Sequence, residues 1–215
     1  MKMNIKYSAL ALAVAASLST GAYAQEEIKG LEVIEVTAQK RSQSVQEVPI
    51  SISAFNGDTL NEMGLQEADQ LGQFVPGLEV NTANGEGSQL IVFMRGAGLT
   101  DFNSNNAGPV GIYSDEVYIS SPALTAFQFF DTQRLEILKG PQGTLYGRNT
   151  TGGAIKFVTN KPTEDFEFSG RLSYAEDNTT AVEGAVSGAL TDHVRARVAF
   201  IKNDSDGYGT NLLDG

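Results

Sequence analysis

Three consecutive segments of this sequence alternate between apolar and polar residues with a period of two. They are residues 166–176 (FEFSGRLSYAE), 181–190 (AVEGAVSGAL) and 194–201 (VRARVAFI). Successive side chains of a β-strand point to opposite faces of the sheet, so each segment predicts a strand with one apolar and one polar face. A short TDH sequence (191–193) separates the second segment from the third, as in a tight turn. The pattern predicts three sequential antiparallel strands.

Two kinds of sheet share this alternation. A transmembrane β-strand needs roughly 9 to 11 residues, with its apolar face toward lipid and its polar face toward the lumen. The three segments approach that length. A soluble sheet with one solvated face shows the same pattern. The alternation by itself leaves both interpretations open, but past the N-terminal segment no apolar run is long enough for a membrane helix, so a membrane location would require strands.

The N-terminal residues have the three parts of a secretion signal. Lys2 and Lys6 form a basic region, residues 9–18 an alanine-rich apolar region, and residues 22–24 (AYA) a signal-peptidase site. The apolar region is about half of the roughly 20 residues that a membrane-spanning helix requires. We therefore expect residues 1–24 to be a cleaved signal peptide and the mature chain to begin at Gln25.

Composition narrows the range of partners. The formal net charge is −11, which argues against nucleic acid as a partner because phosphate backbones are bound by basic surfaces. The chain contains no cysteine, so neither disulfides nor a cysteine nucleophile is available. Its one histidine, His193, lies in the predicted turn between two strands, and no G-x-S-x-G motif is present. We expect no enzymatic activity, catalytic residue, metal site or cofactor.

A glycine-dense stretch at residues 134–162 (RLEILKGPQGTLYGRNTTGGAIKFVTNKP) raises the question of phosphate binding. A P-loop requires Lys-Ser or Lys-Thr after its last glycine, and none follows here. The pair Gly96 and Gly98 has no third glycine in dinucleotide-fingerprint spacing. The glycines therefore need another explanation, and we expect them to serve a sharp turn and close packing.

Residues 48–162 predict a small mixed α+β domain. Two stretches, NGDTLNEMG (56–64) and EADQLGQFVPG (67–77), have the start and stop signals of short helices. Strands are predicted where β-branched and apolar residues cluster between polar loops. The predicted strands are residues 48–55, 90–95, 111–119, 134–139 and 153–159. Residues 25–46 are polar with few bulky groups, which indicates a flexible extension.

At this point the chain resembles the start of a TonB-dependent outer-membrane receptor. The resemblance lies in an ordered set of motifs between the secretion signal and the alternating strands: EVIEVTAQKR (32–41), VPISISAF (48–55), GIYSDEVYI (111–119) and the glycine-dense stretch 134–162. It implies an α+β plug domain with a small mixed sheet, followed by the first antiparallel strands of a transmembrane β-barrel, which is incomplete in this chain. The implied domains are a signal peptide (1–24), a flexible tether with a TonB-box-like segment (25–47), the plug (48–162) and three barrel strands (163–215).

The resemblance also implies roles for individual residues. The extended segment Glu32, Val33, Ile34, Glu35, Val36, Thr37 and Ala38 is expected to contact the periplasmic domain of TonB by strand addition. Arg134, Glu136 and Arg148 are expected to make charge contacts inside the plug or to barrel carboxylates, with solvated charges beside a turn as the alternative. The candidate apical ligand contacts are Asn84, Thr100, Asp101, Phe102 and Asn103, with a role in forming loop turns as the alternative.

The function implied is active uptake of a scarce ligand across the outer membrane of a Gram-negative bacterium, with the plug gating the barrel. A ferric siderophore is the favoured ligand, and cobalamin, haem or an oligosaccharide are the others that the family carries. The expected partners are TonB, that ligand and outer-membrane lipid. A barrel of this kind needs several hundred further residues, so we expect the chain to be one piece of a longer receptor or a truncated product. The alternative is a soluble periplasmic plug-like module without transport activity.

The tether assignment yields a first prediction. Replacing Ile34 with proline removes a backbone N–H from the segment expected to pair with TonB. We expect the complete receptor with Ile34→Pro to lose uptake and to keep ligand binding. Uptake assays and binding assays on the same cells measure the two effects, and normal uptake would remove residues 32–38 from the coupling role.

Overall fold

The computed structural model describes residues 34–65, 67–83, 89–101, 103, 105–125, 129–174 and 178–206. The predicted signal peptide, the first part of the tether with Glu32 and Val33, and the loop residues Asn84 and Phe102 lie outside the described residues. Within the described ranges, no helix is both long and apolar enough to cross a membrane.

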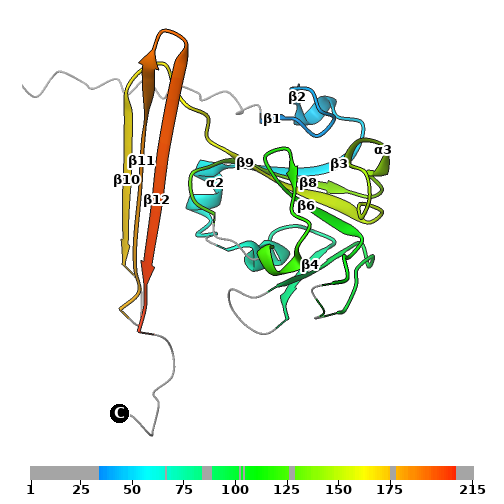
Figure 1. Cartoon of the computed structure of the whole chain (residues 1–215). Coiled ribbons are helices and arrows are strands. Elements are labelled where there is room, and N and C mark those ends of the chain that lie inside the picture. The colour runs from blue at the N-terminus through cyan, green and yellow to red at the C-terminus, as the bar shows by residue number, and fades with distance from the viewer. Residues whose placement is uncertain are drawn as a thin grey trace, which may run out of the picture. The chain divides into compact units, whose positions relative to one another are not determined.

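A five-stranded mixed sheet forms the centre of the predicted α+β domain (Figure 1). Its strand order is β3-β8-β9-β6-β7. Strands β3, β8 and β9 pair antiparallel, β9 pairs parallel with β6, and β6 pairs antiparallel with β7. The bounds are β3 Ser51–Asn56, β6 Val110–Ser114, β7 Val117–Tyr118, β8 Thr132–Lys139 and β9 Gly153–Thr159. The parallel pair arises because the chain crosses from β6 to β9 through β8 and a short helix, α3 (Gly143–Tyr146).

The two predicted helices are present as short elements. Helix α2 (Gly57–Glu62) is capped by Asn56, whose side-chain oxygen accepts a hydrogen bond from the Thr59 backbone N–H at 2.6 Å. The second is a 3₁₀ helix, η2 (Ala68–Gln73), followed by the strand β4 (Leu78–Thr82). Strand β4 was not predicted from the sequence; it pairs antiparallel with the predicted β5 (Leu90–Met94). Two further 3₁₀ turns are η1 (Val45–Glu47) and η3 (Pro122–Leu124).

One strand expectation was wrong. Residues 111–119 predict a single strand, but the chain turns at Asp115 and Glu116 and returns as β7, which makes a hairpin with β6. Asp115 has a φ of 52°, in the left-handed region that aspartate tolerates better than most residues. The Asp115 carboxylate also accepts a hydrogen bond from the Thr159 N–H at 2.9 Å, which fixes the turn against β9.

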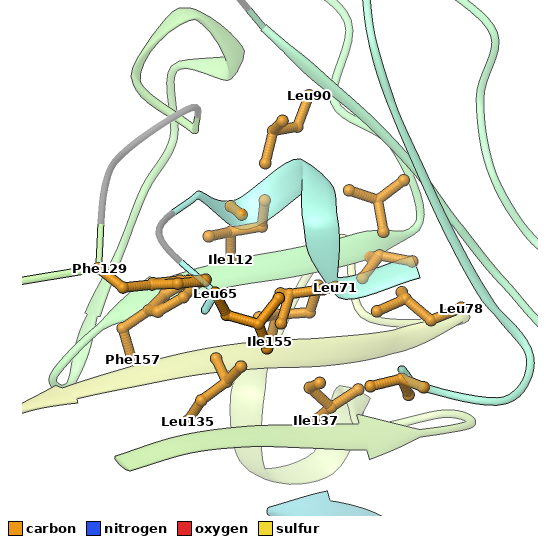
Figure 2. Packing of buried hydrophobic residues seen from close by; sticks show 14 of the residues in the cluster. Leu65, Leu71, Leu78, Leu90, Ile112, Phe129, Leu135, Ile137, Ile155 and Phe157 are labelled. Carbon is orange, nitrogen blue, oxygen red and sulfur yellow. The ribbon is translucent and has the colours of Figure 1, made fainter. Parts of the chain in front are cut away.

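Each face of the central sheet is covered by a different layer. On one face, Leu135, Ile137, Ile155 and Phe157 pack beneath α2, η2 and the β4–β5 hairpin in a continuous apolar cluster (Figure 2). The opposite face holds a second cluster that includes these side chains: Val36, Ala38, Tyr113, Leu138, Tyr146 and Ala154. Strands β8 and β9 lie in the middle of the sheet and are covered on both faces. Consecutive residues are therefore buried along most of β9 and along the second half of β8.

The tether does not behave as the expected flexible extension over residues 34–46. Strand β1 (Glu35–Val36) pairs antiparallel with β2 (Gln43–Ser44), and the small hairpin covers the second face of the sheet. The side chains of Val36 and Ala38 are both 0% exposed. The prediction was wrong because it considered only the few apolar residues within the segment. Those residues are buried against a face of the central sheet, which the local sequence does not reveal.

The three alternating segments form an antiparallel sheet of β10 (Glu167–Tyr174), β11 (Thr180–Thr191) and β12 (Val194–Asp204). Its apolar side chains are the exposed ones: Phe168 is 70%, Leu172 74% and Val198 70% exposed. On the other face, Ala185 and Ser187 are buried. A water-soluble sheet buries its apolar face, so this burial is the reverse of the soluble pattern and matches a strand with lipid on its apolar side.

The glycines of the stretch 134–162 serve backbone conformation and close packing. Gly140 and Gly147 have φ values of 101° and 83°, which favour glycine. Gly153 begins β9 with a φ of 155°, and a Cβ there would overlap both the Met94 sulfur and the Leu138 carbonyl oxygen. The sheet can therefore form at this point only because residue 153 has no side chain.

Two glycine substitutions test this explanation. We expect Gly153→Ala to lower the free energy of unfolding by more than about 2 kcal/mol, because the new methyl group adds overlap to an unfavourable φ. Gly143→Ala is the matched control: a Cβ there meets nothing within 4 Å, and the change should stay within about 0.5 kcal/mol. Urea unfolding of both variants measures the difference, and equal stability would refute the packing role of Gly153.

Candidate functional site

Two opposite charges are buried between the tether and the central sheet. Glu136 on β8 and Lys156 on β9 are cross-strand partners on the face that the tether covers. They are 0% and 1% exposed. A buried charge is costly unless it is paired and hydrogen-bonded, so the groups around these two side chains decide whether the sheet and the tether stay together.

Thr37 of the tether supplies most of those hydrogen bonds. Its backbone N–H and its hydroxyl donate to Glu136 Oε1, at 2.8 and 3.1 Å. The same hydroxyl oxygen accepts from Lys156 Nζ at 2.7 Å and from Arg134 Nη2 at 3.0 Å. One threonine therefore bridges a buried carboxylate and two cations, and uses the full bonding capacity of its hydroxyl.

Arg134 completes the pairing of Glu136. Its Nε donates to Glu136 Oε1 at 2.7 Å. The Arg134 side chain is mostly buried, at 13% exposed. The second oxygen, Glu136 Oε2, is buried and has no hydrogen-bond partner among the residues that the structure describes. All the bonds of this carboxylate thus converge on one oxygen, and two of those three bonds come from the tether.

Glu116, in the turn between β6 and β7, lies at the solvent-exposed edge of the same cluster. Its carboxylate binds both Lys156 and Lys40, so it joins the buried sheet lysine to the tether lysine. Partial burial raises the pKa of Glu116, but the hydrogen bonds from Lys156 and Lys40 outweigh it and hold the pKa below its usual range. The carboxylate therefore stays charged at neutral pH.

Tyr146 of α3 holds the next residue of the tether. Its hydroxyl donates to the Ala38 carbonyl oxygen at 2.9 Å in a buried contact, and Lys40 Nζ lies 4.7 Å from the centre of its ring. Burial raises the pKa of Tyr146 well above its ordinary value, with further contributions from Glu136, Glu116 and Tyr113. The hydroxyl thus keeps its proton and remains a hydrogen-bond donor.

The predicted site residues fall into two groups. Ile34, Val36 to Ala38, Arg134 and Glu136 are brought together at this cluster. Glu35 is exposed and accepts a hydrogen bond from Ser42 instead. Arg148 is exposed and has no hydrogen bond or ion pair with a described residue. Sequence reasoning missed Lys156, Glu116 and Tyr146. The one available signal was Lys156 itself, a lysine in the middle of the apolar run GAIKFVT.

A different ion pair joins the mixed domain to the three-stranded sheet. Arg197 of β12 donates from Nε to both oxygens of Asp131, at 2.9 and 3.0 Å, and both side chains are largely buried. Glu183 of β11 accepts from the Asp131 backbone N–H at 3.0 Å. Of the two alternatives expected for Arg134 and Glu136, the structure shows the charge contact within the domain; the ion pair to the strands is a different one, with its arginine on the strands and its carboxylate on the domain. The bonds of Arg134 run instead to Gln133, Glu136 and Thr37.

Loop residues line a pocket next to the β4–β5 hairpin. Its empty volume is about 540 Å³, including space open to solvent, and its polar lining includes Gln89, Asp101, Asn106 and Thr125. Hydrogen bonds from the Asn106 side chain and the Asn103 backbone lower the pKa of Asp101. Of the candidate ligand contacts, Asp101 lines this pocket, while Thr100 and Asn103 are exposed nearby in the chain. The described residues contain no group of three acidic or histidine side chains able to hold a metal ion.

Comparison with known proteins identifies the domain. The family model of the TonB-dependent receptor plug domain matches residues 44–154, just over half of the chain. The chain belongs to this family. The mixed sheet thus belongs to a plug domain, and β10–β12 are antiparallel strands that follow it, as in outer-membrane receptors of this kind.

Among curated relatives, the vitamin B12 transporter BtuB of Vibrio vulnificus (strain YJ016) is 26% identical over 205 residues, which cover 95% of this chain and 33% of the relative. A pesticin receptor of Yersinia enterocolitica is 32% identical over 143 residues, covering 66% of this chain and 20% of the receptor. The chain therefore spans about a third or less of the length of these relatives.

Solved structures agree with the plug assignment. The ferric yersiniabactin uptake receptor FyuA from Yersinia pestis matches with a TM-score of 0.61 at 27% identity, over 71% of this chain and 24% of that one. The pyoverdine outer membrane receptor FpvA from Pseudomonas aeruginosa PAO1 matches with a TM-score of 0.66 at 22% identity, over 80% of this chain and 24% of that one. This second likeness concerns the fold alone.

The buried cluster of the plug gives a stability prediction. We expect Glu136→Ala to lower the free energy of unfolding by about 3–5 kcal/mol, because it leaves buried donors on Arg134 and Thr37 without their acceptor. Glu47→Ala, at an exposed position, is the control and should change stability by less than about 0.5 kcal/mol. Urea unfolding compares the two, and similar values would show that the cluster contributes nothing.

Proposed function

We propose that this chain is the N-terminal part of a TonB-dependent outer-membrane receptor that takes up a scarce ligand, with the plug gating the barrel. The relatives named above include a vitamin B12 transporter and a ferric yersiniabactin uptake receptor, which supports cobalamin and ferric siderophores as ligand classes. We keep a ferric siderophore as the favoured ligand. Haem and oligosaccharides are the other ligands the family resemblance implies.

We further propose that Glu32 to Ala38 is the segment that TonB binds. The observation that carries this proposal is the docking of residues 34–38: an extended segment, held on the plug by side-chain bonds to Thr37 and Ala38 and by burial of Val36 and Ala38, with a two-residue pairing of β1 and β2 inside the tether itself. Strand addition needs a free backbone edge. One edge of β1 is paired with β2, and the Thr37 N–H and the Ala38 carbonyl are bonded to Glu136 and Tyr146. We therefore expect TonB binding to require the segment to leave the plug.

The alternative is a soluble periplasmic module. The exposed apolar face of β10–β12 argues against it, because Phe166, Phe168, Leu172, Tyr174 and Val198 are each at least 70% exposed. An apolar surface of this kind in water favours aggregation or association. Contact with outer-membrane lipid gives it a suitable environment, in keeping with a transmembrane strand.

Uptake in cells tests the proposed function. We expect deletion of the gene to abolish uptake of one member of a panel of ⁵⁵Fe-labelled siderophores and labelled cyanocobalamin. A plasmid copy of the complete gene should restore that uptake only in cells with functional TonB. Restoration without TonB, or no change for any ligand of the panel, would contradict the proposal. Secretion of the product as a soluble periplasmic protein would favour the alternative.

A further inference from the structure

The loop pocket next to the β4–β5 hairpin is lined by one charged side chain, which is acidic. Among the described residues of the lining, that side chain is Asp101, and none is basic. By sequence, the segments that connect the strands in this region, residues 81–89, 96–109 and 120–128, contain no lysine, arginine or histidine. An anion bound here would therefore lie near a carboxylate, without a cation of the pocket to balance it.

Two arginines of the plug lie outside this lining. Arg95 is the single basic residue between positions 42 and 133, and its Nη2 donates to Ser51 Oγ at 2.7 Å, at the start of β3. Arg148 is exposed, and its neighbour Asn149, rather than Arg148 itself, bonds to a tyrosine of the pocket. The pocket therefore presents a negative charge that no described basic residue of its lining offsets.

Asp101 keeps its charge and can accept further hydrogen bonds. Its Oδ1 accepts from the Asn103 backbone N–H at 2.8 Å, and its Oδ2 accepts from the Asn106 side-chain amide at 2.5 Å. These bonds lower the pKa of Asp101, so the carboxylate is ionised at neutral pH. Each carboxylate oxygen has two acceptor positions, and the described contacts use one on each. Asp101 is thus suited to accept from O–H or N–H groups of a ligand and to repel its anionic groups.

The rest of the lining combines apolar side chains with uncharged polar ones. Amide and hydroxyl groups come from Gln89, Asn106, Tyr118 and Ser120, and the apolar part includes Leu90, Val92, Val110 and Ile112. Ligand sites in proteins commonly combine an apolar wall with a few polar groups that fix the orientation of the ligand. A neutral molecule with amide or hydroxyl groups can bond to these side chains without bringing an unpaired charge out of water.

We propose that the loop pocket selects its ligand by charge: it accepts a neutral ferric tris-hydroxamate, through uncharged amide and hydroxyl groups of that complex, and rejects anionic ferric complexes. Three singly charged hydroxamates neutralise one Fe³⁺ ion, whereas three doubly charged catecholates leave the complex strongly anionic. The inference rests on the proposed function in taking the pocket as part of the ligand site of a siderophore receptor. A neutral oligosaccharide offers the same uncharged hydroxyl chemistry, so the test includes one.

Charge-dependent thiol labelling tests the pocket without a known ligand. Residues 1–215 contain no cysteine, so Ala107→Cys places a thiol at an exposed residue of the lining in the full-length gene product. The control is Gln73→Cys, at an exposed residue of η2 outside the lining. We expect the rate ratio of the cationic reagent MTSET to the anionic reagent MTSES to be at least about fivefold higher at residue 107 than at residue 73. Mass spectrometry of the labelled peptides measures the rates.

Removal of the carboxylate charge identifies its source. In the Ala107→Cys background, Asp101→Asn retains a side-chain oxygen that can accept from the Asn103 N–H, as Asp101 does. We expect this variant to bring the labelling ratio at residue 107 to within about twofold of the ratio at residue 73, because the local negative charge is gone.

Binding of defined complexes to the full-length gene product forms the second arm. We expect ferrichrome, a neutral ferric tris-hydroxamate, to bind with a Kd at least about tenfold below that of ferric enterobactin, an anionic tris-catecholate. Ser120→Lys adds a cation at an exposed residue of the lining and should shift this ratio toward ferric enterobactin by at least about fivefold. Gln73→Lys adds the same charge outside the lining and should leave the ratio within about twofold. Isothermal titration calorimetry measures each Kd, with ferric citrate and maltohexaose as further probes.

An anionic complex as the tightest-bound probe would overturn the charge selection, and so would equal ratios in Ser120→Lys and Gln73→Lys. Binding of maltohexaose alone would support the charge selection and overturn the hydroxamate as the ligand. If no probe binds, the labelling decides. A ratio at residue 107 equal to that at residue 73 then overturns the charge selection, and a raised ratio that Asp101→Asn abolishes supports it.

Failure of the proposed function is a separate outcome. If the labelling ratio and the order of Kd values are as expected but the gene supports no TonB-dependent uptake, the charge selection stands and the receptor assignment falls. If the gene supports TonB-dependent uptake of an anionic ferric complex, the receptor assignment stands and the charge selection falls.

Discussion

The charge of Glu136, buried with Lys156 in the middle of the plug sheet, is the constraint on which the site depends. Neither charge can lie under an apolar layer without partners, and the sheet itself supplies only part of what they need. Thr37 supplies the rest through its N–H and hydroxyl. The tether is therefore part of the core. If it leaves, Glu136 and Lys156 lose the hydrogen bonds to Thr37 and must be solvated by water or stay unpaired.

The two faces of the central sheet differ in a way that suits a releasable segment. Leu135, Ile137 and Ile155 face a large apolar cluster that holds α2, η2 and the β4–β5 hairpin. Glu136 and Lys156, one residue over on the same strands, face the tether. Because side chains alternate along a strand, β8 and β9 present an apolar surface on one side and, on the other, a mixed surface where Glu136 and Lys156 lie among apolar residues such as Leu138 and Ala154. Water can replace the hydrogen bonds of Thr37 when the tether leaves, whereas the burial of Val36 and Ala38 is lost without replacement.

The three-stranded sheet is anchored to the plug by its polar face. The Asp131–Arg197 pair, with Glu183 on the Asp131 N–H, lies at the start of β8. Asn160, just past the end of β9, also bonds to Asp131, which has a φ of 49° and so depends on its surroundings to hold that conformation. This end of the plug is thus fixed by several bonds at once, while the tether cluster on the covered face of the sheet depends on Thr37, Ala38 and Lys40.

Local pattern in the sequence determined much of the fold. The period of two predicted β10–β12, the caps and stops predicted α2 and η2, and the apolar runs predicted β5, β8 and β9, because each signal arises from neighbours in the chain. The motifs also led to the plug family. The tertiary structure alone decided that the tether is docked, that the 111–119 segment folds into a hairpin, and that Lys156, Glu116 and Tyr146 meet there. Thr37 lies 99 residues from Glu136 and 119 from Lys156. A local sequence pattern cannot predict a contact at that separation. The contact forms only after the sheet has folded and presents a face that the tether can cover.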